Sequence, residues 1–288
     1  MNAGGTALAP GDVTGDLTIR DVRGPAEMAD CVRLYEHVMG LKEGDGSLNP
    51  RLLTALQHNS GLVIGAYLGT EIVGFTYSFL ARERDAARGR ELLYQYSQLA
   101  VVARDCQGAG IGRQLKAAQR ERCLAEGTTL LRWAYDPLQA RNAHFNLDVL
   151  GGVVDTLLPA MYGPAGFGDG TGEATDRFIV SWHLDRDPGP APRPLRIPAP
   201  TRLTGAVHPD GDDVLVVVPD DWRHHRRLLG HEQAAADRDN LTKTFARLLA
   251  DRSAVSCQRI GDGLAAYRFT PRTPANWQRP IPDRQPAP

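Results

Sequence analysis

A strand that leads directly into a glycine-rich turn and then into a helix constrains this chain more than any other segment. Residues 99–115 read LAVVARDCQGAGIGRQL. The glycines at positions 108, 110 and 112 let the backbone approach a ligand closely and turn its N–H groups toward it. The N-terminus of the following helix adds a partial positive charge, which favours a bound phosphate or pyrophosphate. The segment therefore predicts a strand, a phosphate-binding loop over Gln107–Gly112, and a helix.

The same glycines could belong to a turn without a ligand or to another kind of phosphate-binding loop. A glycine-capped turn without a ligand would show the same pattern. A Rossmann loop requires G-x-G-x-x-G, whose third glycine is missing here, and a P-loop requires a lysine followed by serine or threonine, which is also absent. On the helix that follows, Arg122 is expected to reach toward solvent from an apolar stripe of Ile111, Leu115, Ala118 and Ala125.

The apolar periodicity along the chain predicts an α/β fold of the mixed α+β kind, with a central sheet flanked by helices. The expected order of elements is β-α-α-β-β-β-α-β-α-β-β. The expected strands are 17–22, 61–68, 71–80, 94–103, 128–135, 153–158 and 177–183. The expected helices are 24–39, 50–58, the helix from the glycine loop to about 126, and 142–150.

A proline-dense segment divides the chain. Prolines at 188, 190, 192, 194, 198 and 200 favour an extended linker over residues 187–200. We expect a larger domain over residues 14–186 and a small C-terminal α/β unit over residues 201–272. That unit is expected to contain strands near 214–218, 254–260 and 264–269, with a helical stretch between 220 and 250. Residues 273–288 are expected to form a disordered tail.

The composition excludes several classes of function. A formal net charge of −1 argues against a nucleic-acid-binding protein, which needs a surplus of lysine and arginine. No segment approaches the ~18 apolar residues of a membrane span, and the N-terminus shows no export signal, so we expect a cytoplasmic protein. The cysteines lack metal-ligand spacing and are expected to be reduced, buried thiols: Cys31, Cys106, Cys123 and Cys257.

The loop sequence QGAGIG at 107–112 resembles the Q/R-x-x-G-x-G/A motif of the GNAT superfamily of acyl-CoA-dependent N-acyltransferases. The resemblance covers residues 17–184, where the order of elements agrees, and implies a GNAT-like sheet. It implies that the loop holds the CoA pyrophosphate and that the preceding strand meets the pantetheine arm. The residues that it assigns to CoA are Leu99, Val101, Val102, Gln107, Gly108, Ala109, Gly110, Ile111, Gly112, Arg113 and Asn142. Within the family, residues 135–147 (YDPLQARNAHFNL) resemble a bacterial branch of predicted acetyltransferases.

Some of these positions have a structural alternative. Asn142 can cap the helix that follows it as well as make a polar contact to CoA. The basic run 222–227 with His231 is expected to be a solvated helix face, with a contact to the CoA phosphates or to another subunit as the alternative. His224 and His225 are adjacent, so on a helix they point ~100° apart and are poorly placed to share one metal ion. We therefore expect no metal.

Acyl transfer to an amine needs a proton acceptor, an oxyanion donor and a proton for the departing thiolate. The resemblance implies that the backbone N–H of Val101 or its neighbour is the oxyanion donor. Many relatives carry a glutamate base in the same strand, where this chain has Ser97 and Gln98. Many also carry a tyrosine acid where this chain has Leu147. The candidates for a catalytic replacement of that acid are His144 and Tyr162, with Tyr135 as a further one.

Two functions from different classes follow from this pattern. The first is an N-acyltransferase that moves an acetyl or related acyl group from CoA to a small-molecule amine such as an amino acid. The second is a non-catalytic CoA-binding or regulatory module with a degenerate active site. Acetyl-CoA or another acyl-CoA is the expected cosubstrate in the first case, and a homodimer is left open.

Overall fold

The computed structural model describes residues 16–42, 48–85, 90–163, 176–186, 193–198 and 203–272. The chain divides into two compact units, Met1–Arg132 and Trp133–Pro288. The expected tail over 273–288 lies outside the described residues.

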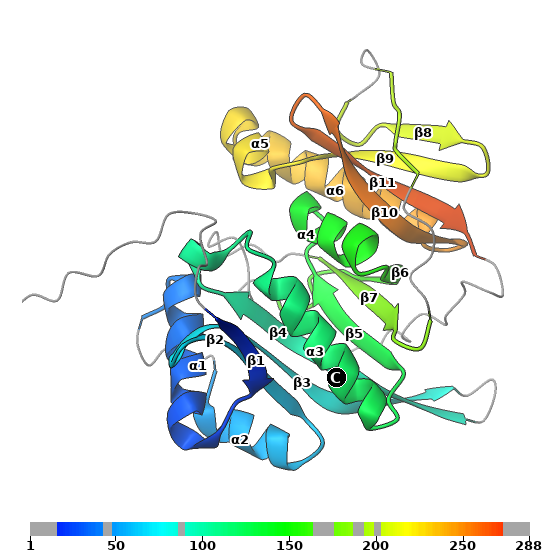
Figure 1. Cartoon of the computed structure of the whole chain (residues 1–288). Helices are drawn as coiled ribbons and strands as arrows, with labels where there is room; N and C mark the ends of the chain where they lie inside the picture. Colours follow the sequence, from blue (N-terminus) through cyan, green and yellow to red (C-terminus); the bar gives the residue numbers. More distant parts are fainter. Residues whose placement is uncertain are drawn as a thin grey trace, which may run out of the picture. The chain divides into compact units, whose positions relative to one another are not determined.

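The first unit contains a mixed sheet in the order β1-β2-β3-β4-β5. All neighbouring strands are antiparallel except the parallel pair β4–β5. The strands are β1 (Leu17–Asp21), β2 (Leu62–Leu68), β3 (Glu71–Asp85), β4 (Arg90–Val102) and β5 (Leu130–Tyr135), whose last residues belong to the second unit. The helices are α1 (Gly24–Met39), α2 (Pro50–His58), the short 3₁₀ turn η1 (Arg104–Cys106) and α3 (Ile111–Ala125) (Figure 1).

Helices cover both faces of this first sheet. A Cβ built at Gly74 would lie 3.3 Å from side-chain atoms of Ile111 and Leu115, so that face of β3 contacts α3. Phe75 and Tyr77 belong to an apolar core with side chains of α1 and α2. Since successive residues of a strand point to opposite faces, α3 lies on one face and α1 with α2 on the other.

The second unit contains antiparallel strands in the order β7-β6-β10-β11-β9-β8. The strands are β6 (Val153–Leu158), β7 (Arg177–His183), β8 (Val207–Asp210), β9 (Asp213–Pro219), β10 (Arg252–Gly261) and β11 (Leu264–Pro271). The helices are α4 (Ala140–His144), which continues as the π-helix η2 (Phe145–Val149), α5 (Trp222–Leu229) and α6 (His231–Leu248).

An aromatic cluster joins the two ends of the second unit's sequence. The ring of Phe178 on β7 is 5.0 Å from that of Phe245 on α6 and 5.7 Å from that of Tyr267 on β11, centroid to centroid. All three rings are fully buried, and each such edge-to-face pair adds ~0.5–1.5 kcal/mol beyond its buried area. Residues before and after the proline-dense segment therefore share one core.

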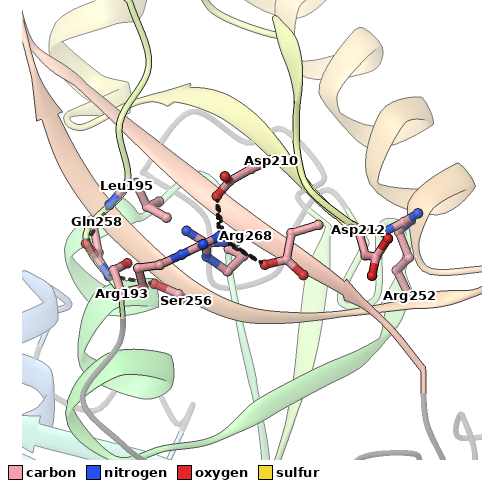
Figure 2. A network of polar contacts seen from close by, with 9 residues as sticks. Arg193, Leu195, Asp210, Asp212, Arg252, Ser256, Gln258 and Arg268 are labelled. Atoms are coloured by element: carbon pink, nitrogen blue, oxygen red, sulfur yellow. Dashed lines mark hydrogen bonds and ion pairs between the residues drawn. The ribbon is translucent and has the colours of Figure 1, made fainter.

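Part of the proline-dense segment is packed against the sheet. Leu195 and Ile197 are buried against β9 and β11 beside Leu215. Figure 2 shows how the segment is held: Arg193 Nη2 lies 2.7 Å from Asp210 Oδ2, and the Leu195 N–H donates to the side chain of Gln258. The described residues 193–198 are therefore attached to the second unit along their length.

The predicted order of the first eleven elements is confirmed, and the differences have physical reasons. The stretch 220–250 is two helices, because Gly230 at φ 80° interrupts it. The short edge strand β8 was not predicted, since Pro209 lies within it. The helix expected at 142–150 begins at Ala140, so Asn142 lies inside it and does not cap it.

The predicted domain boundaries at 186 and 201 stay a prediction, but the division between the two compact units falls elsewhere. β10 pairs with β6, and the carboxylate of Asp148 accepts hydrogen bonds from Ser256 Oγ and from the Cys257 N–H. These contacts lie within the second unit and link residues on both sides of the proline-dense segment.

A truncation tests whether residues 133–186 fold without the C-terminal strands. A chain ending at Arg186 would expose Phe178 and the edge of β6, so we expect it to be insoluble or to lose its tertiary packing. Near-ultraviolet circular dichroism and NMR dispersion measure this. A chain ending at Arg272 is the control and should fold like the parent. Cooperative unfolding of the shorter chain would support the predicted boundary instead.

Candidate functional site

The glycine loop has a backbone that only glycine adopts readily. Gly108 has φ 91°, and Gly110 has φ 81° and is the N-cap residue of α3. No side chain in the described part of the chain caps this helix. A Cβ built at 108, 110 or 112 would meet no atom within 4 Å, so the surroundings of the loop are open on the side of these glycines.

This conformation leaves a row of backbone donors without partners. The N–H groups of Arg113 and Gln114 both donate to the carbonyl of Gly110, at 3.1 Å. Among the described residues, the five N–H groups of 108–112 have no acceptor. Consecutive unpaired N–H groups at a helix N-terminus form a concavity with partial positive charge, which suits an anion.

Side-chain and backbone contacts tie the loop to β4. Gln107 Nε2 donates to the carbonyl of Val102 at 3.1 Å. The N–H of Ala103 donates to the carbonyl of Val73 on β3 at 2.8 Å. Arg104 Nη2 donates to the carbonyl of Val38 at the end of α1. The strand, the loop and the helix therefore form one connected unit.

The edge of β4 next to the loop is open within the first unit. β5 pairs with β4 only at Gln95 and Tyr96. From Ser97 to Val102 the strand is paired with β3 alone in that unit. Its register shifts opposite Tyr77 and Ser78, which leaves Gln98 as a bulge residue.

The register decides which backbone groups face this open edge. In an antiparallel ladder, residues alternate between pointing both polar groups toward one neighbour and toward the other. The N–H of Ala103 points to β3, so the N–H groups of Ala100 and Val102 turn toward the open edge. The carbonyl of Val102 also faces away from β3, since it accepts a hydrogen bond from the side chain of Gln107. The family resemblance implies that the N–H of Val101 or of its neighbour is the oxyanion donor, and this register favours the neighbours Ala100 and Val102.

The other predicted CoA residues of the first unit are close together in the sequence and the fold. Leu99 and Val101 direct their side chains into the core with α1 and α2, and the same alternation turns their backbone N–H groups toward β3. Ile111 is buried under α3 against Gly74. Ala109 is half-buried within the loop, and the side chain of Arg113 is exposed on the first turn of α3.

The remaining predicted site residues belong to the second unit. The His144 side chain is 52% exposed, and its Nδ1 lies 2.9 Å from the carbonyl of Cys257 and 3.3 Å from Asp148 Oδ2. This ring is therefore anchored on β10 through one nitrogen. The guanidinium of Arg177 lies 5.3 Å from the ring centroid of Tyr162. Asn142 is exposed on α4.

Tyr135 and Leu147 are both part of the second unit's core. Burial raises the pKa of the Tyr135 hydroxyl well above its ordinary value, and this hydroxyl lies 3.3 Å from that of Tyr267. Leu147 is 2% exposed. The position that the family resemblance associates with an acid is therefore a packed apolar side chain here.

Sequence reasoning missed a buried polar cluster on the α3 face of the first sheet. Lys116 is 4% exposed, and its Nζ lies 2.8 Å from Ser97 Oγ and 3.1 Å from Gln119 Oε1. Burial lowers the pKa of Lys116 to about 7. One pattern in the sequence could have indicated the buried face of α3. Ile111, Leu115, Gln119 and Cys123 recur at a spacing of four and are all buried, and Lys116 is buried beside them. The predicted position of Ala125 in this stripe is wrong, because Ala125 is exposed.

Metal-binding clusters and membrane-spanning helices are both absent from the described residues. Over the described ranges, no group of three or more His, Cys, Asp or Glu side chains is placed to hold a metal ion. The helices in the same ranges include none that is long and apolar enough to cross a membrane.

Comparison with known proteins gives structural similarities only. No family model matches the chain, and no curated protein matches it. Similar solved structures include an acetyltransferase of the GNAT family from Streptococcus pneumoniae (15% identity, 58% of this chain and 99% of that one, TM-score 0.44). A second is a ribosomal-protein-alanine N-acetyltransferase from Brucella melitensis (17% identity, 58% of this chain and 99% of that one, TM-score 0.45). A third is yncA from Salmonella typhimurium, solved with its cofactor acetyl-CoA (19% identity, 60% of this chain and 97% of that one, TM-score 0.46).

The likeness to these solved structures is distant by both measures. Their identities are below 25% and their TM-scores below 0.5. At these values the likeness carries no argument about activity, which has to come from the residues of the loop and of β4.

Proposed function

We propose that this chain is an acyl-CoA-dependent N-acyltransferase that transfers an acetyl or related acyl group to a small-molecule amine such as an amino acid. One observation carries the proposal. Five consecutive backbone N–H groups that have no acceptor among the described residues lie at the N-terminus of α3, shortly after a strand whose edge is open within its unit. The QGAGIG sequence of the loop supports CoA as the ligand through its resemblance to the GNAT motif.

The loop fits a pyrophosphate in charge and in space. Its N–H groups and the helix N-terminus supply partial positive charge without a permanent cation. The exposed guanidinium of Arg113 adds a full positive charge on the first turn. The open space beside Gly108, Gly110 and Gly112 leaves room for phosphate oxygens at hydrogen-bond distance from the backbone.

The open edge of β4 fits the pantetheine arm, which contains amide groups. An extended chain with amides can add to a free strand edge through main-chain hydrogen bonds. The N–H groups of Ala100 and Val102 then face the bound arm, and either can donate to the thioester oxygen as negative charge develops on it. Removal of one such donor typically costs ~10²–10³-fold in turnover.

His144 and Tyr162 remain the proposed candidates for the acid that protonates the departing thiolate, and Asn142 a proposed contact to CoA. The Nε2 of His144 is the ring atom for this role, since Nδ1 faces Cys257 and Asp148. The acceptor amine, a cytoplasmic location, a homodimer and the absence of a metal stay proposals as well.

A second function is favoured by two residues. Leu147 is packed in the core, and Ser97 is a hydroxyl, at positions where the family resemblance associates an acid and a base. A CoA-binding or regulatory module without catalysis would retain the loop and dispense with both groups. We prefer catalysis because positioning and the backbone donors supply much of the rate in acyl transfer.

Substitutions in the loop test CoA binding. Gly110→Asp places a carboxylate next to the phosphates, so we expect CoA affinity to fall ~10-fold or more, about 1.4 kcal/mol, by calorimetry. Gly112→Ala has no backbone strain and should stabilise the helix by ~0.5–1 kcal/mol while weakening CoA binding.

Gly127→Asp is the matched control for Gly110→Asp. Gly127 has φ 75° and open surroundings at the other end of α3, so the substitution introduces the same strain and charge away from the loop. Its CoA affinity should equal that of the parent. Parental affinity in Gly110→Asp would show that the loop does not hold the pyrophosphate.

The release of free thiol from acetyl-CoA separates the two functions. With a panel of amino acids and other small amines, we expect thiol release that depends on one class of amine and on chain concentration. Tight CoA binding together with no amine-dependent release across the panel would favour the non-catalytic module. Mass spectrometry of the acceptor identifies the amide that forms.

A further inference from the structure

Lys116 is a buried ionisable group that has no role in the proposed function. It lies in the second turn of α3, and its nitrogen contacts two neutral oxygens, Ser97 Oγ and Gln119 Oε1. Burial lowers its pKa to about 7, so a large fraction of the side chain is the neutral amine at that pH. A neutral amine can accept the proton of the Ser97 hydroxyl and still donate to Gln119.

Burial is the larger effect on the pKa of Lys116 and favours the neutral form, whereas Cys123, on the same helix, acts against it by raising that pKa. Burial raises the pKa of the Cys123 thiol itself to about 12, so the thiol is uncharged. On β1, the charged Asp21 pairs with Arg122 of α3. The buried residues of the other strands on this face are uncharged: Ile64 and Ala66 on β2, Thr76 and Ser78 on β3, and Gln95 and Ser97 on β4.

The choice of lysine at this position stands out from the chain's composition. Of 33 basic Lys and Arg residues, three are lysines, at 42, 116 and 243. Arginine cannot lose its proton in a protein, whereas a buried lysine can. The buried position on α3 therefore carries the type of basic side chain that is able to act as a proton acceptor.

Ser97 lies where the open edge of β4 begins, and its side chain is 3% exposed and contacts Lys116 on the α3 face. The last β4 residue with a partner on β5 is Tyr96, so the open edge within the unit begins at Ser97. The bulge residue Gln98 follows it, and the edge donors Ala100 and Val102 lie further along the same strand. The hydroxyl of Ser97 is thus on the strand that the proposed function assigns to the thioester.

We infer that Ser97 and Lys116 form a relay that accepts the proton lost by the amine during acyl transfer. This inference rests on the proposed function. The nitrogen lone pair of the amine forms the new bond to the thioester carbonyl carbon, and the C–S bond breaks with its electron pair on the CoA sulfur. The amine proton passes to Ser97 Oγ while the hydroxyl proton moves to Lys116 Nζ. The acid proposed above, His144 or Tyr162, protonates the thiolate, and water carries the proton of Lys116 back to that acid, so an amine and a thioester give an amide and a thiol.

Lys116→Met and Ser97→Ala test the relay. Each variant should bind CoA like the parent and lose ~10²–10⁴-fold in turnover, the usual effect of general acid–base help. In the parent, turnover should fall as the pH decreases below about 7, where Lys116 becomes protonated. This acid limb should be absent in Lys116→Met, while Ser97→Thr should retain it because it keeps the hydroxyl. Lys243→Met, at an exposed lysine paired with Asp239, is the control.

A second readout does not depend on activity. In NMR spectra of the chain labelled with ¹³C-lysine, one of the three lysine signals should titrate near pH 7 and be absent from Lys116→Met, while the others titrate near ~10.4. The unfolded chain binds this proton up to ~10.4, so the parent should gain stability as the pH rises from about 7 toward 10. Lys116→Met should lack this gain.

The outcomes separate the relay from the proposed function. An active parent whose acid limb survives in both Lys116→Met and Ser97→Ala contradicts the relay and leaves the function intact. A Lys116 signal that titrates near ~10.4 also contradicts it. If Lys116→Met fails to fold, the pH profile of Ser97→Ala decides. A parent that binds CoA and acylates no amine contradicts the proposed function, and the relay with it.

Discussion

The pairing of the last residues of β4 with β3 is the constraint on which the rest of the site depends. The hydrogen bond from Ala103 to Val73 holds the strand's end in register, and this register turns the N–H groups of Ala100 and Val102 away from β3. Because the pairing of β5 with β4 ends at Tyr96, no strand of the first unit takes up these groups. A free edge normally invites association, and here it ends in a loop that suits an anion. An extended ligand with a phosphate end fits both features at once.

Two properties of helix α3 lower the stability of the fold. Its N-terminus has no side-chain cap, and it begins with glycines that favour the unfolded chain. Its inner face buries an amine that costs free energy when protonated. Packing of Ile111 and Leu115 against β3 at Gly74 offsets these costs, since the missing Cβ at Gly74 lets the helix approach the sheet closely. The proposed site therefore includes positions on α3 whose residues destabilise the helix locally.

The sequence was most informative where the determinants are local. The glycine pattern at 108–112 predicted the loop and the start of α3, because positive φ angles favour glycine wherever it occurs. The bulge at Gln98 could not be predicted, since it depends on the register with β3. Lys116 was missed because a charged residue on a helix is ordinarily assigned to solvent. The second unit's common core was missed because the contact of Phe178 with Phe245 spans a segment rich in proline.

The central claim is that the pyrophosphate of CoA lies on the 108–112 loop and its pantetheine arm on the open edge of β4. Backbone amide NMR during a titration with CoA tests it most directly, because these amides have no acceptor among the described residues or face the open edge. The account predicts the largest shifts, with slowed hydrogen exchange, at the N–H groups of residues 108–112 and of Ala100 and Val102. Saturable binding that shifts amides elsewhere and leaves these unchanged would contradict it.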